Sequence, residues 1–319
     1  MRFLLGAEQR AFADSLDAML TAADTPSVVR DWSRGEHASG RALWSRIAQA
    51  GVFALAVPEE YEGIGRRPVE LAVSFVELGR HAVPGPLVET VTAAVLLTEP
   101  GPAERLLPAL ASGEAMATLA PSGSYALDGD AATTRLALTP DGLRLAPGHG
   151  PVRPSLDPAR RLTALTPGGE LLTCDPPVTH ALTTARLTTA AQALGVGLAL
   201  LDRTVAYAKQ RTQFGVPIGS FQAVKHRLAD AKIALEFAGP LVFGAALSMG
   251  PAEVAAAKVA ACEAAYATAR TALQLHGAIG YTAEYDLALW LTKARALRTA
   301  WGSPRECRAL VVNAGDRRW

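Results

Sequence analysis

The chain has 319 residues, of which 50% are hydrophobic and 19% charged, with a formal net charge of +1 at pH 7. These values exclude an intrinsically disordered chain and a strongly basic nucleic-acid-binding surface. Its three cysteines, Cys174, Cys262 and Cys307, are too few and too widely spaced for a disulfide framework or a zinc site. The N-terminus does not read as a signal sequence and no apolar run reaches transmembrane length. We therefore expect a reduced, cytoplasmic protein without a metal, nucleic-acid or membrane partner.

Helical patterns dominate the first third of the chain. Apolar residues recur at helical spacing in five segments, namely residues 7–20, 42–50, 68–78, 87–97 and 103–110. The polar stretch 33–40 predicts a loop. Three acids, Glu59, Glu60 and Glu62, lie in a glycine-containing loop without the spaced oxygen ligands of a calcium site, and we interpret them as solvated. We predict an N-terminal helical domain over residues 1–114.

The pattern changes to short strands in the middle of the chain. Proline and glycine recur there, and short apolar runs at 116–120, 135–139 and 162–166 lie between them. This pattern is typical of β structure. We predict a shortened β domain over residues 115–182.

Long helices return after residue 182. Apolar residues at steps of three and four mark one helix through 187–205 and a second through 224–238. A third helix is expected at 251–276, with Pro251 in its first turn and Gly277 as its C-terminal cap. We predict a helical bundle over residues 183–319.

The loop between the first two of these helices carries side chains that could bind a ligand. Residues 211–222 read Arg-Thr-Gln-Phe-Gly-Val-Pro-Ile-Gly-Ser-Phe-Gln. A guanidinium at a helix end, an aromatic ring and two amides suit an anionic, planar ligand. The spacing alone leaves another interpretation open, in which Arg211 is a solvated helix-end cation and Phe214 is a core plug.

Two segments resemble the signatures of the acyl-CoA dehydrogenase family. The first is Arg211-x-x-Phe-Gly followed by Pro217-Ile-x-x-Phe-Gln222, and the second is Gln274-Leu-His-Gly-Ala-Ile-Gly280, with Ala278 where glycine is usual. The resemblance implies a mostly α, acyl-CoA dehydrogenase-like fold. It would have an N-terminal helical domain, a reduced middle β domain and a C-terminal four-helix bundle.

The resemblance also implies FAD as the cofactor, bound at a subunit interface. In the family, the β domain of one chain holds the flavin ring, and the neighbouring chain contributes both signatures to the pyrophosphate and adenosine end. The matching cofactor-binding residues in this sequence are Arg211, Gln213, Phe214, Gln222, Gln274 and Gly277.

The family's catalytic base has no counterpart here. The reaction needs a carboxylate within reach of the α-proton of the thioester. The two glutamate positions used in the family correspond to Trp301 and to Ala185, which precedes Arg186. Glu306 lies close in sequence but beyond the turn, and the strand that meets the flavin in the family also has no match. We therefore assign no catalytic residue to this chain.

These features lead us to expect a subunit that completes FAD sites on a different chain. Certain actinobacterial enzymes acting on CoA esters of steroid side chains are similar, being α2β2 heterotetramers with fewer flavins than chains. The resemblance then implies an oxidoreductase of lipid and steroid catabolism, with an acyl-CoA substrate, electron-transfer flavoprotein as the acceptor, and an inactive lone chain. Two alternatives remain open: a homo-oligomeric flavoenzyme with a different base, and a structural or regulatory subunit without flavin contact.

Other conspicuous residues have simpler interpretations. His276, inside the second signature, is expected to pack or to bond to backbone, and Cys262 to be a small core residue. Trp290 and Trp301 are expected to be core or interface anchors. His37 is expected to be an ordinary surface or loop residue.

Overall fold

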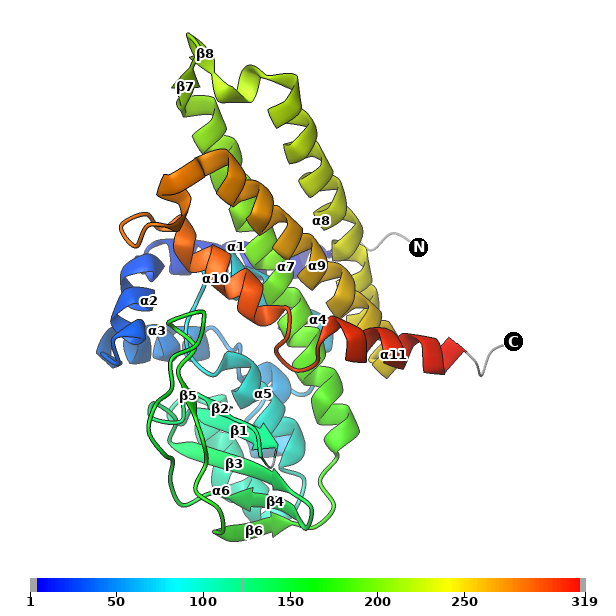
Figure 1. Cartoon of the computed structure of the whole chain (residues 1–319). Coiled ribbons are helices and arrows are strands. Elements are labelled where there is room, and N and C mark those ends of the chain that lie inside the picture. The colour runs from blue at the N-terminus through cyan, green and yellow to red at the C-terminus, as the bar shows by residue number, and fades with distance from the viewer. Residues whose placement is uncertain (1–4, 122, 316–319) are drawn as a thin grey trace. The chain divides into compact units, whose positions relative to one another are not determined.

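The computed structural model describes residues 5–121 and 123–315, and the chain divides into two compact units (Figure 1). The first unit comprises Met1–Ala13, Phe75–Ala82 and Arg186–Trp319, and the second comprises Asp14–Ser74 and Val83–Ala185. Helices α1 (Ala7–Thr21), α4 (Pro68–Arg80) and α7 (Val178–Gln210) contribute residues to both units. The fold is mostly helical with a small sheet, as predicted.

The first unit is a helical bundle in which α9 is the central helix. Its further helices are α8 (Gln222–Ser248), α9 (Pro251–His276), α10 (Leu287–Leu297) and α11 (Pro304–Gly315). Helix α9 packs against α8, α10 and α11. A short hairpin, β7 (Thr212–Gln213) and β8 (Val216–Pro217), connects α7 to the single turn η3 (Ile218–Ser220) and then to α8, and η4 (Gly277–Tyr281) follows α9.

Small residues allow these helices to pack closely. A Cβ atom added at Gly197 would lie 2.5 Å from the Leu235 side chain and 3.2 Å from the Cα of Ala265, so α7 touches α8 and α9 through a residue without a side chain. Alanines dominate the core beside Trp290, which is fully buried and whose Nε1–H donates to the Arg80 carbonyl at 2.8 Å. The expected core roles of Trp290 and Cys262 are confirmed.

The second unit combines short helices with two sheets. Its helices are α2 (Thr25–Ser33), α3 (Ala38–Gln49), α5 (Leu87–Leu96) and α6 (Pro100–Ala111), with single turns η1 (Ala54–Ala56) and η2 (Glu59–Tyr61). Strands β1 (Ala117–Pro121), β3 (Thr134–Thr139), β4 (Gly142–Leu145) and β6 (Glu170–Thr173) form one sheet in that order. The β1–β3 pair is parallel and the other pairs are antiparallel. Strands β2 (Ala126–Leu127) and β5 (Leu162–Thr163) pair separately.

Helix α5 is fixed to the first strand of the larger sheet by a side chain. The Thr90 hydroxyl donates to the carbonyl oxygen of Ala117 at 3.0 Å and accepts from its N–H at 3.1 Å. Both atoms belong to the start of β1, so the hydroxyl satisfies backbone groups that no neighbouring strand reaches.

Most predicted elements appear, but the helices α2, α10 and α11 and the strands β2, β4 and β6 were not predicted. The predicted helices and strands of the first 182 residues correspond to α1, α3–α6, β1, β3 and β5. The loop predicted at 33–40 is wrong at both ends, because α2 extends to Ser33 and α3 begins at Ala38. The three-domain division stays a prediction: its 114/115 boundary falls inside the second unit, and its 182/183 boundary lies three residues before the change of unit at Arg186.

Helix α8 is unusually apolar for its position. Among the described residues it is the one helix whose length and composition would suit a membrane crossing, although only 33% of its apolar window is buried. The sequence analysis predicted no apolar segment of transmembrane length, and α8 contradicts that prediction by its length and composition. A helix that belongs to a soluble bundle passes the same test, so this property alone assigns no membrane.

Candidate functional site

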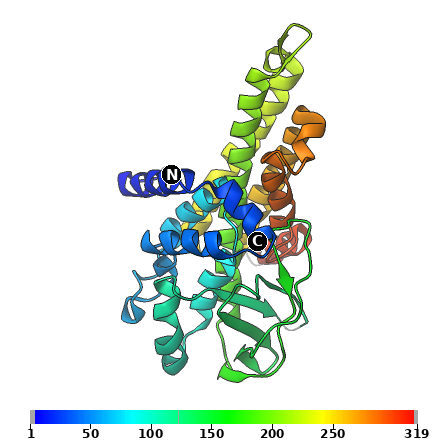
Figure 2. The same cartoon turned by 90° about the vertical axis from the view of Figure 1, so that its left-hand side faces the viewer.

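The 211–222 loop forms a hairpin beyond the ends of α7 and α8 (Figures 1 and 2). Phe214 and Gly215 occupy its two turn positions with φ angles of 55° and 78°. Positive φ at both positions defines a type I′ turn, which favours Asn and Gly. A phenylalanine there is a conformational outlier that costs free energy. Its ring is 93% exposed, so the interpretation of Phe214 as a core plug is wrong.

Arg211 lies at the junction of α7 and the hairpin. Its N–H donates to the Tyr207 carbonyl, and its own carbonyl accepts from the N–H of Ile218, both at 2.8 Å, which closes the base of the hairpin. Its side chain is exposed and, within residues 5–121 and 123–315, makes no ion pair. Gln213 donates its amide to the Thr212 carbonyl at 2.8 Å, and Gln222 is the exposed first residue of α8. These four candidate residues therefore share one surface feature.

The second signature lies at the end of α9 and contacts α8. The Gln274 side-chain oxygen accepts a short hydrogen bond from Arg227, which lies on α8 five residues after Gln222. Gly277 caps α9 with φ of 67°, as predicted, and a Cβ at this position would meet open space. Arg227 connects the two signatures, and the sequence did not single it out. In the sequence, Arg227 is marked only by its position, about one and a half turns into the helix that follows the first signature.

His276 is buried between two tyrosines beneath this surface. Its ring stacks on Tyr207 with centroids 4.1 Å apart and lies 5.6 Å from Tyr285. Its Nδ1 is 2.8 Å from the Ala272 carbonyl, which confirms the expected backbone bond. Burial lowers the pKa of His276 below its usual value. The residue therefore acts as neutral packing that fixes the end of α9 to α7.

The turn at the predicted base position, Trp301, is held by two cationic side chains. Trp301 and Gly302 have φ angles of 57° and 129°. Arg186 donates from Nε to the Trp301 carbonyl at 3.2 Å, and the buried Lys258 donates from Nζ to the Gly302 carbonyl at 2.7 Å. Trp301 itself is half-buried, whereas Ala185 is fully buried in α7. Neither position offers a proton-accepting side chain.

Glu306 caps α11. Its Oε2 accepts from the Ser303 N–H at 2.7 Å, and the Ser303 hydroxyl accepts from the Glu306 N–H at 3.3 Å. This reciprocal pair is a capping box, which satisfies two N–H groups at the start of the helix. The backbone hydrogen bond from Ser303 lowers the pKa of Glu306. Its carboxylate is therefore used structurally, which argues against it as a replacement base.

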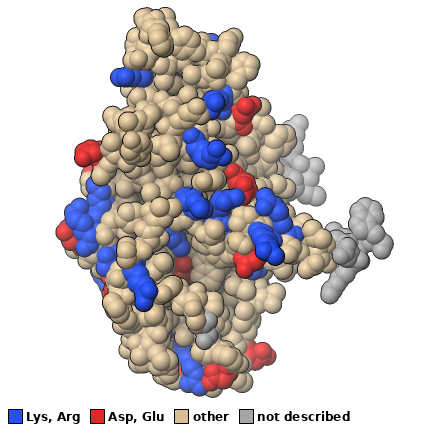
Figure 3. Space-filling view, viewed as in Figure 1, with Lys and Arg blue, Asp and Glu red and all other residues tan. Residues whose placement is uncertain are grey.

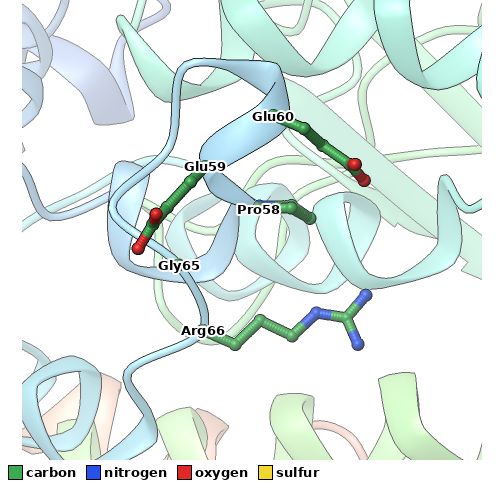
Figure 4. A pocket seen from close by; sticks show the side chains of 5 residues that line it. All are labelled: Pro58, Glu59, Glu60, Gly65 and Arg66. Atoms are coloured by element: carbon green, nitrogen blue, oxygen red, sulfur yellow. The ribbon is translucent and has the colours of Figure 1, made fainter.

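The acidic loop 59–62 carries its side chains on the surface of the second unit. Pro58, Glu59, Glu60, Gly65 and Arg66 line a shallow pocket, and Figure 4 shows the two carboxylates pointing away from each other. All three acids of this loop, including Glu62, are exposed. The interpretation of these acids as a solvated group is consistent with this geometry.

His37 lies in the loop between α2 and α3, as expected, but its ring is packed against other residues. Its ring lies 4.6 Å from Trp32, and its Nε2 is 3.7 Å from Oδ2 of Asp130, which also forms an ion pair with Arg161 at 2.6 Å. Burial lowers the pKa of His37. It is part of the packing between α2 and the turn after β2.

Charge is unevenly distributed on the first unit. Figure 3 shows Lys and Arg gathered over α10 and α11, whereas few charged side chains lie on this face of the hairpin. Two guanidinium groups, those of Arg295 and Arg298, lie 5.6 Å and 5.0 Å from the ring centroid of Tyr266, and Arg298 also pairs with Glu263 at 2.9 Å. On the face that Figure 3 shows, charged side chains are therefore concentrated away from the hairpin.

Comparison with known proteins identifies the family. Residues 6–114 match the N-terminal domain of acyl-CoA dehydrogenases and residues 177–313 match the C-terminal domain. Acyl-CoA dehydrogenase IpdE2 of Mycobacterium tuberculosis is 35% identical over 303 residues, covering 94% of each chain.

Solved structures show the same fold. A chain of the ChsE4–ChsE5 complex of Mycobacterium tuberculosis has a TM-score of 0.84 at 23% identity, covering 99% of this chain and 98% of that one. A chain of the Tcur3481–Tcur3483 steroid acyl-CoA dehydrogenase has a TM-score of 0.81 at 24% identity, covering 98% and 99%. The family binds FAD, and structures of this fold include FAD complexes. The chain belongs to the acyl-CoA dehydrogenase family.

Proposed function

We propose that this chain is a subunit of an FAD-dependent acyl-CoA dehydrogenase that completes the FAD site of a different, base-carrying chain. The observation that carries this proposal is the contrast between two turns of the first unit. The 211–222 hairpin presents an unpaired guanidinium and a strained, exposed aromatic ring. The 301–303 turn presents no carboxylate for catalysis, because Glu306 caps α11.

The exposed residues of the two signatures fit one end of FAD. Arg211 is free to pair with a pyrophosphate oxygen, since guanidinium groups bind phosphate well. The amides of Gln213, Gln222 and Gln274 can donate to and accept from ribose or adenine edges. Gly277 leaves open space where a side chain would obstruct a ligand. FAD, when bound, supplies the acceptor for the hydride that leaves the β-carbon of the thioester.

Exposure favours a cofactor shared with another chain. All six candidate residues are at the surface, and five side chains that project into water cannot enclose a dinucleotide. Small-molecule sites bury most of their ligand. A partner surface placed over the hairpin would supply the missing walls and would desolvate the Arg211–phosphate pair, which strengthens it.

The partner would also supply the chemistry that this chain lacks. Proton abstraction requires a carboxylate within hydrogen-bond reach of the α-carbon. We propose that the partner's glutamate takes this role in an α2β2 assembly with fewer flavins than chains. The proposed substrate class is an acyl-CoA thioester, with the CoA ester of a steroid side chain as the specific candidate. Electron-transfer flavoprotein is the proposed acceptor and the cytoplasm the proposed location.

The experiment is co-expression with a dehydrogenase-like partner chain, followed by measurement of bound FAD per assembly. Arg211→Ala is expected to lower FAD retention at least tenfold without dissociating the chains. Lys232→Ala, which removes an exposed cation on α8 outside the 211–222 hairpin, is the matched control and should retain FAD. Full FAD retention by the Arg211 variant would support a structural subunit without flavin contact. A yellow lone protein that bleaches with an acyl-CoA would instead support a homo-oligomeric flavoenzyme.

A further inference from the structure

Arg227 forms the polar end of a stripe on α8 that is otherwise apolar and buried. The stripe follows steps of four, four, three and four along the helix, through Arg227, Ala231, Leu235, Ala238 and Val242. Residues at this spacing share one face, and the four apolar members are buried where α8 packs on α9. Arg227 itself is exposed, and its Nη1 donates a short hydrogen bond to Oε1 of Gln274 in the last turn of α9.

The contact between Arg227 and Gln274 is not needed to hold the two helices together. The buried apolar residues of the stripe already join α8 to α9, and burial of apolar surface is the dominant favourable contribution to folding. A hydrogen bond between two exposed side chains replaces hydrogen bonds to water and adds little net stability. The contact is therefore explained by its effect on the Gln274 side chain rather than by its effect on the fold.

The hydrogen bond from Arg227 determines which end of the Gln274 amide faces a ligand. A glutamine amide accepts hydrogen bonds through its carbonyl oxygen and donates them through its NH2 group. A guanidinium has donors and no acceptor, so the amide must turn its oxygen towards Arg227. Within residues 5–121 and 123–315, the NH2 group of Gln274 makes no hydrogen bond. Its two N–H donors therefore remain available to a ligand.

The backbone that carries Gln274 is fixed independently of Arg227. His276, two residues further along α9, is buried and stacks on Tyr207 of α7 with ring centroids 4.1 Å apart. Gly277 then ends the helix and has open space beside it. The Gln274 side chain is thus held at its backbone by the helix and at its tip by Arg227. A side chain that is ordered before binding loses less conformational entropy when the ligand arrives.

We propose that Arg227 is a positioning residue of the FAD site, which holds the NH2 group of Gln274 towards the pyrophosphate and adenosine end of the cofactor. The inference rests on the proposed function, in which Gln274 belongs to the surface that meets FAD. It narrows the role of Gln274 to that of a hydrogen-bond donor, which suits phosphate oxygens, ribose oxygens and the ring nitrogens of adenine. Arg227 acts through Gln274 and does not itself contact FAD.

The test measures the dissociation constant of FAD for the co-expressed assembly, after its flavin has been removed, by quenching of flavin fluorescence. Arg227→Met keeps a long apolar stem and removes the guanidinium. It should weaken FAD binding about tenfold, the order expected for one lost hydrogen bond to a charged group, and leave thermal unfolding of the lone chain unchanged. Arg227→Lys keeps a donor and should restore most of the affinity. Lys225→Met removes an exposed cation nearby on α8 and should leave the affinity unchanged.

A double-mutant cycle separates positioning from a direct effect of the Arg227 charge. Gln274→Met removes the donor and should weaken FAD binding about tenfold by itself. Addition of Arg227→Met to this variant should then cause no further loss, because a positioning residue acts only through the amide. Gln274→Glu keeps a contact with Arg227, as an ion pair, but has no N–H donor. It should bind FAD no better than Gln274→Met.

Three results would overturn the proposal. The first is unchanged FAD affinity in Arg227→Met, and the second is an additive loss in the double variant, which would assign Arg227 a direct interaction with FAD. The third is full affinity in Gln274→Glu, which would show that no donor is required at this position. Arg211→Ala in the same assay keeps the two ideas apart. Loss of FAD there without loss in Arg227→Met refutes the positioning role alone, whereas no loss in either variant refutes the proposed cofactor site.

Discussion

Phe214 shows how one backbone angle can carry functional information. The signature predicts an aromatic residue at this position, but spacing alone equally allows a core role. The structure places Phe214 at φ of 55° with 93% of its surface exposed, and its ring makes an edge-on contact with Phe221 at a centroid distance of 6.2 Å. The positive φ of Phe214 and the exposure of its side chain both cost the isolated chain free energy. We therefore attribute both features to the proposed binding of FAD.

Replacing Phe214 by asparagine should separate stability from binding. Asparagine tolerates positive φ, so Phe214→Asn is expected to stabilise the lone chain by about 1 kcal/mol in urea unfolding. In the co-expressed assembly it should weaken FAD retention about tenfold. Val216→Thr, on the extended arm of the same hairpin, is the control and should change neither quantity. Loss of stability together with unchanged FAD would contradict the proposed binding role.

Asp128 is a buried acid that the sequence did not single out. Its Oδ1 accepts from Trp32 Nε1 at 3.1 Å and from the Arg161 N–H at 3.2 Å, and its Oδ2 is buried without a hydrogen-bond partner among the described residues. Burial raises the pKa of Asp128 to about 8, against these two hydrogen bonds, which lower it. The folded chain therefore holds a proton at neutral pH that the unfolded chain releases.

This proton predicts a pH-dependent stability. Because the folded state binds the extra proton, the free energy of unfolding should fall as pH rises from about 4 towards 8, with a slope of at most about 1.4 kcal/mol per pH unit. Asp128→Asn should flatten this dependence in thermal unfolding between pH 5 and pH 8. The exposed Asp141→Asn should keep it. An identical slope in wild type and Asp128→Asn would show that the carboxyl is ionised in the folded chain.

At the scale of elements, the 301–306 turn is fixed by contacts that do not involve the side chain at position 301. Arg186 and Lys258 hold two successive carbonyl groups, and Ser303 and Glu306 start α11 as a capping box. These contacts stabilise the turn whatever side chain stands at Trp301. The geometry of this turn therefore does not depend on a carboxylate at position 301.

The two roles available to Glu306 predict different mutant behaviour. Glu306→Ala removes the cap and should destabilise the chain by about 1 kcal/mol, whereas Glu306→Gln keeps an acceptor for the Ser303 N–H. Turnover of the co-expressed assembly with an acyl-CoA and an artificial acceptor should be unchanged in both variants. A 10²-fold to 10⁴-fold loss in Glu306→Gln would instead identify Glu306 as the base.

Long periodic helices could be predicted from the sequence, and a short one could not. Apolar steps of three and four located α7 and α8 because each continues over several turns. Helix α2 has nine residues, contains Pro26 and follows Asp24 at φ of 45°, so its pattern is too short to recognise. Since Trp32 on this helix buries Asp128, missing the helix also concealed the buried acid.

At the scale of the whole molecule, the sequence located the candidate site but not the contacts that complete it. The resemblance predicted six cofactor-binding residues and no catalytic base because both predictions rest on continuous motifs. The hydrogen bond from Arg227 to Gln274 and the exposure of Ile233, Phe237, Leu241 and Leu247 on α8 depend on how distant helices pair. Residue periodicity marked one face of α8 as buried, but it could not show that the other face would remain apolar and exposed.

The most direct measurement is the FAD content of the purified lone chain, determined by absorbance at the flavin band against chain concentration. If the exposed hairpin serves a partner's FAD and the 301–306 turn supplies no base, the lone chain should be colourless. A co-expressed assembly should then contain fewer FAD molecules than chains. Addition of free FAD to the lone chain should give no stable complex after gel filtration. One FAD retained per lone chain, reducible by an acyl-CoA, would contradict the proposal that this subunit serves a partner's cofactor.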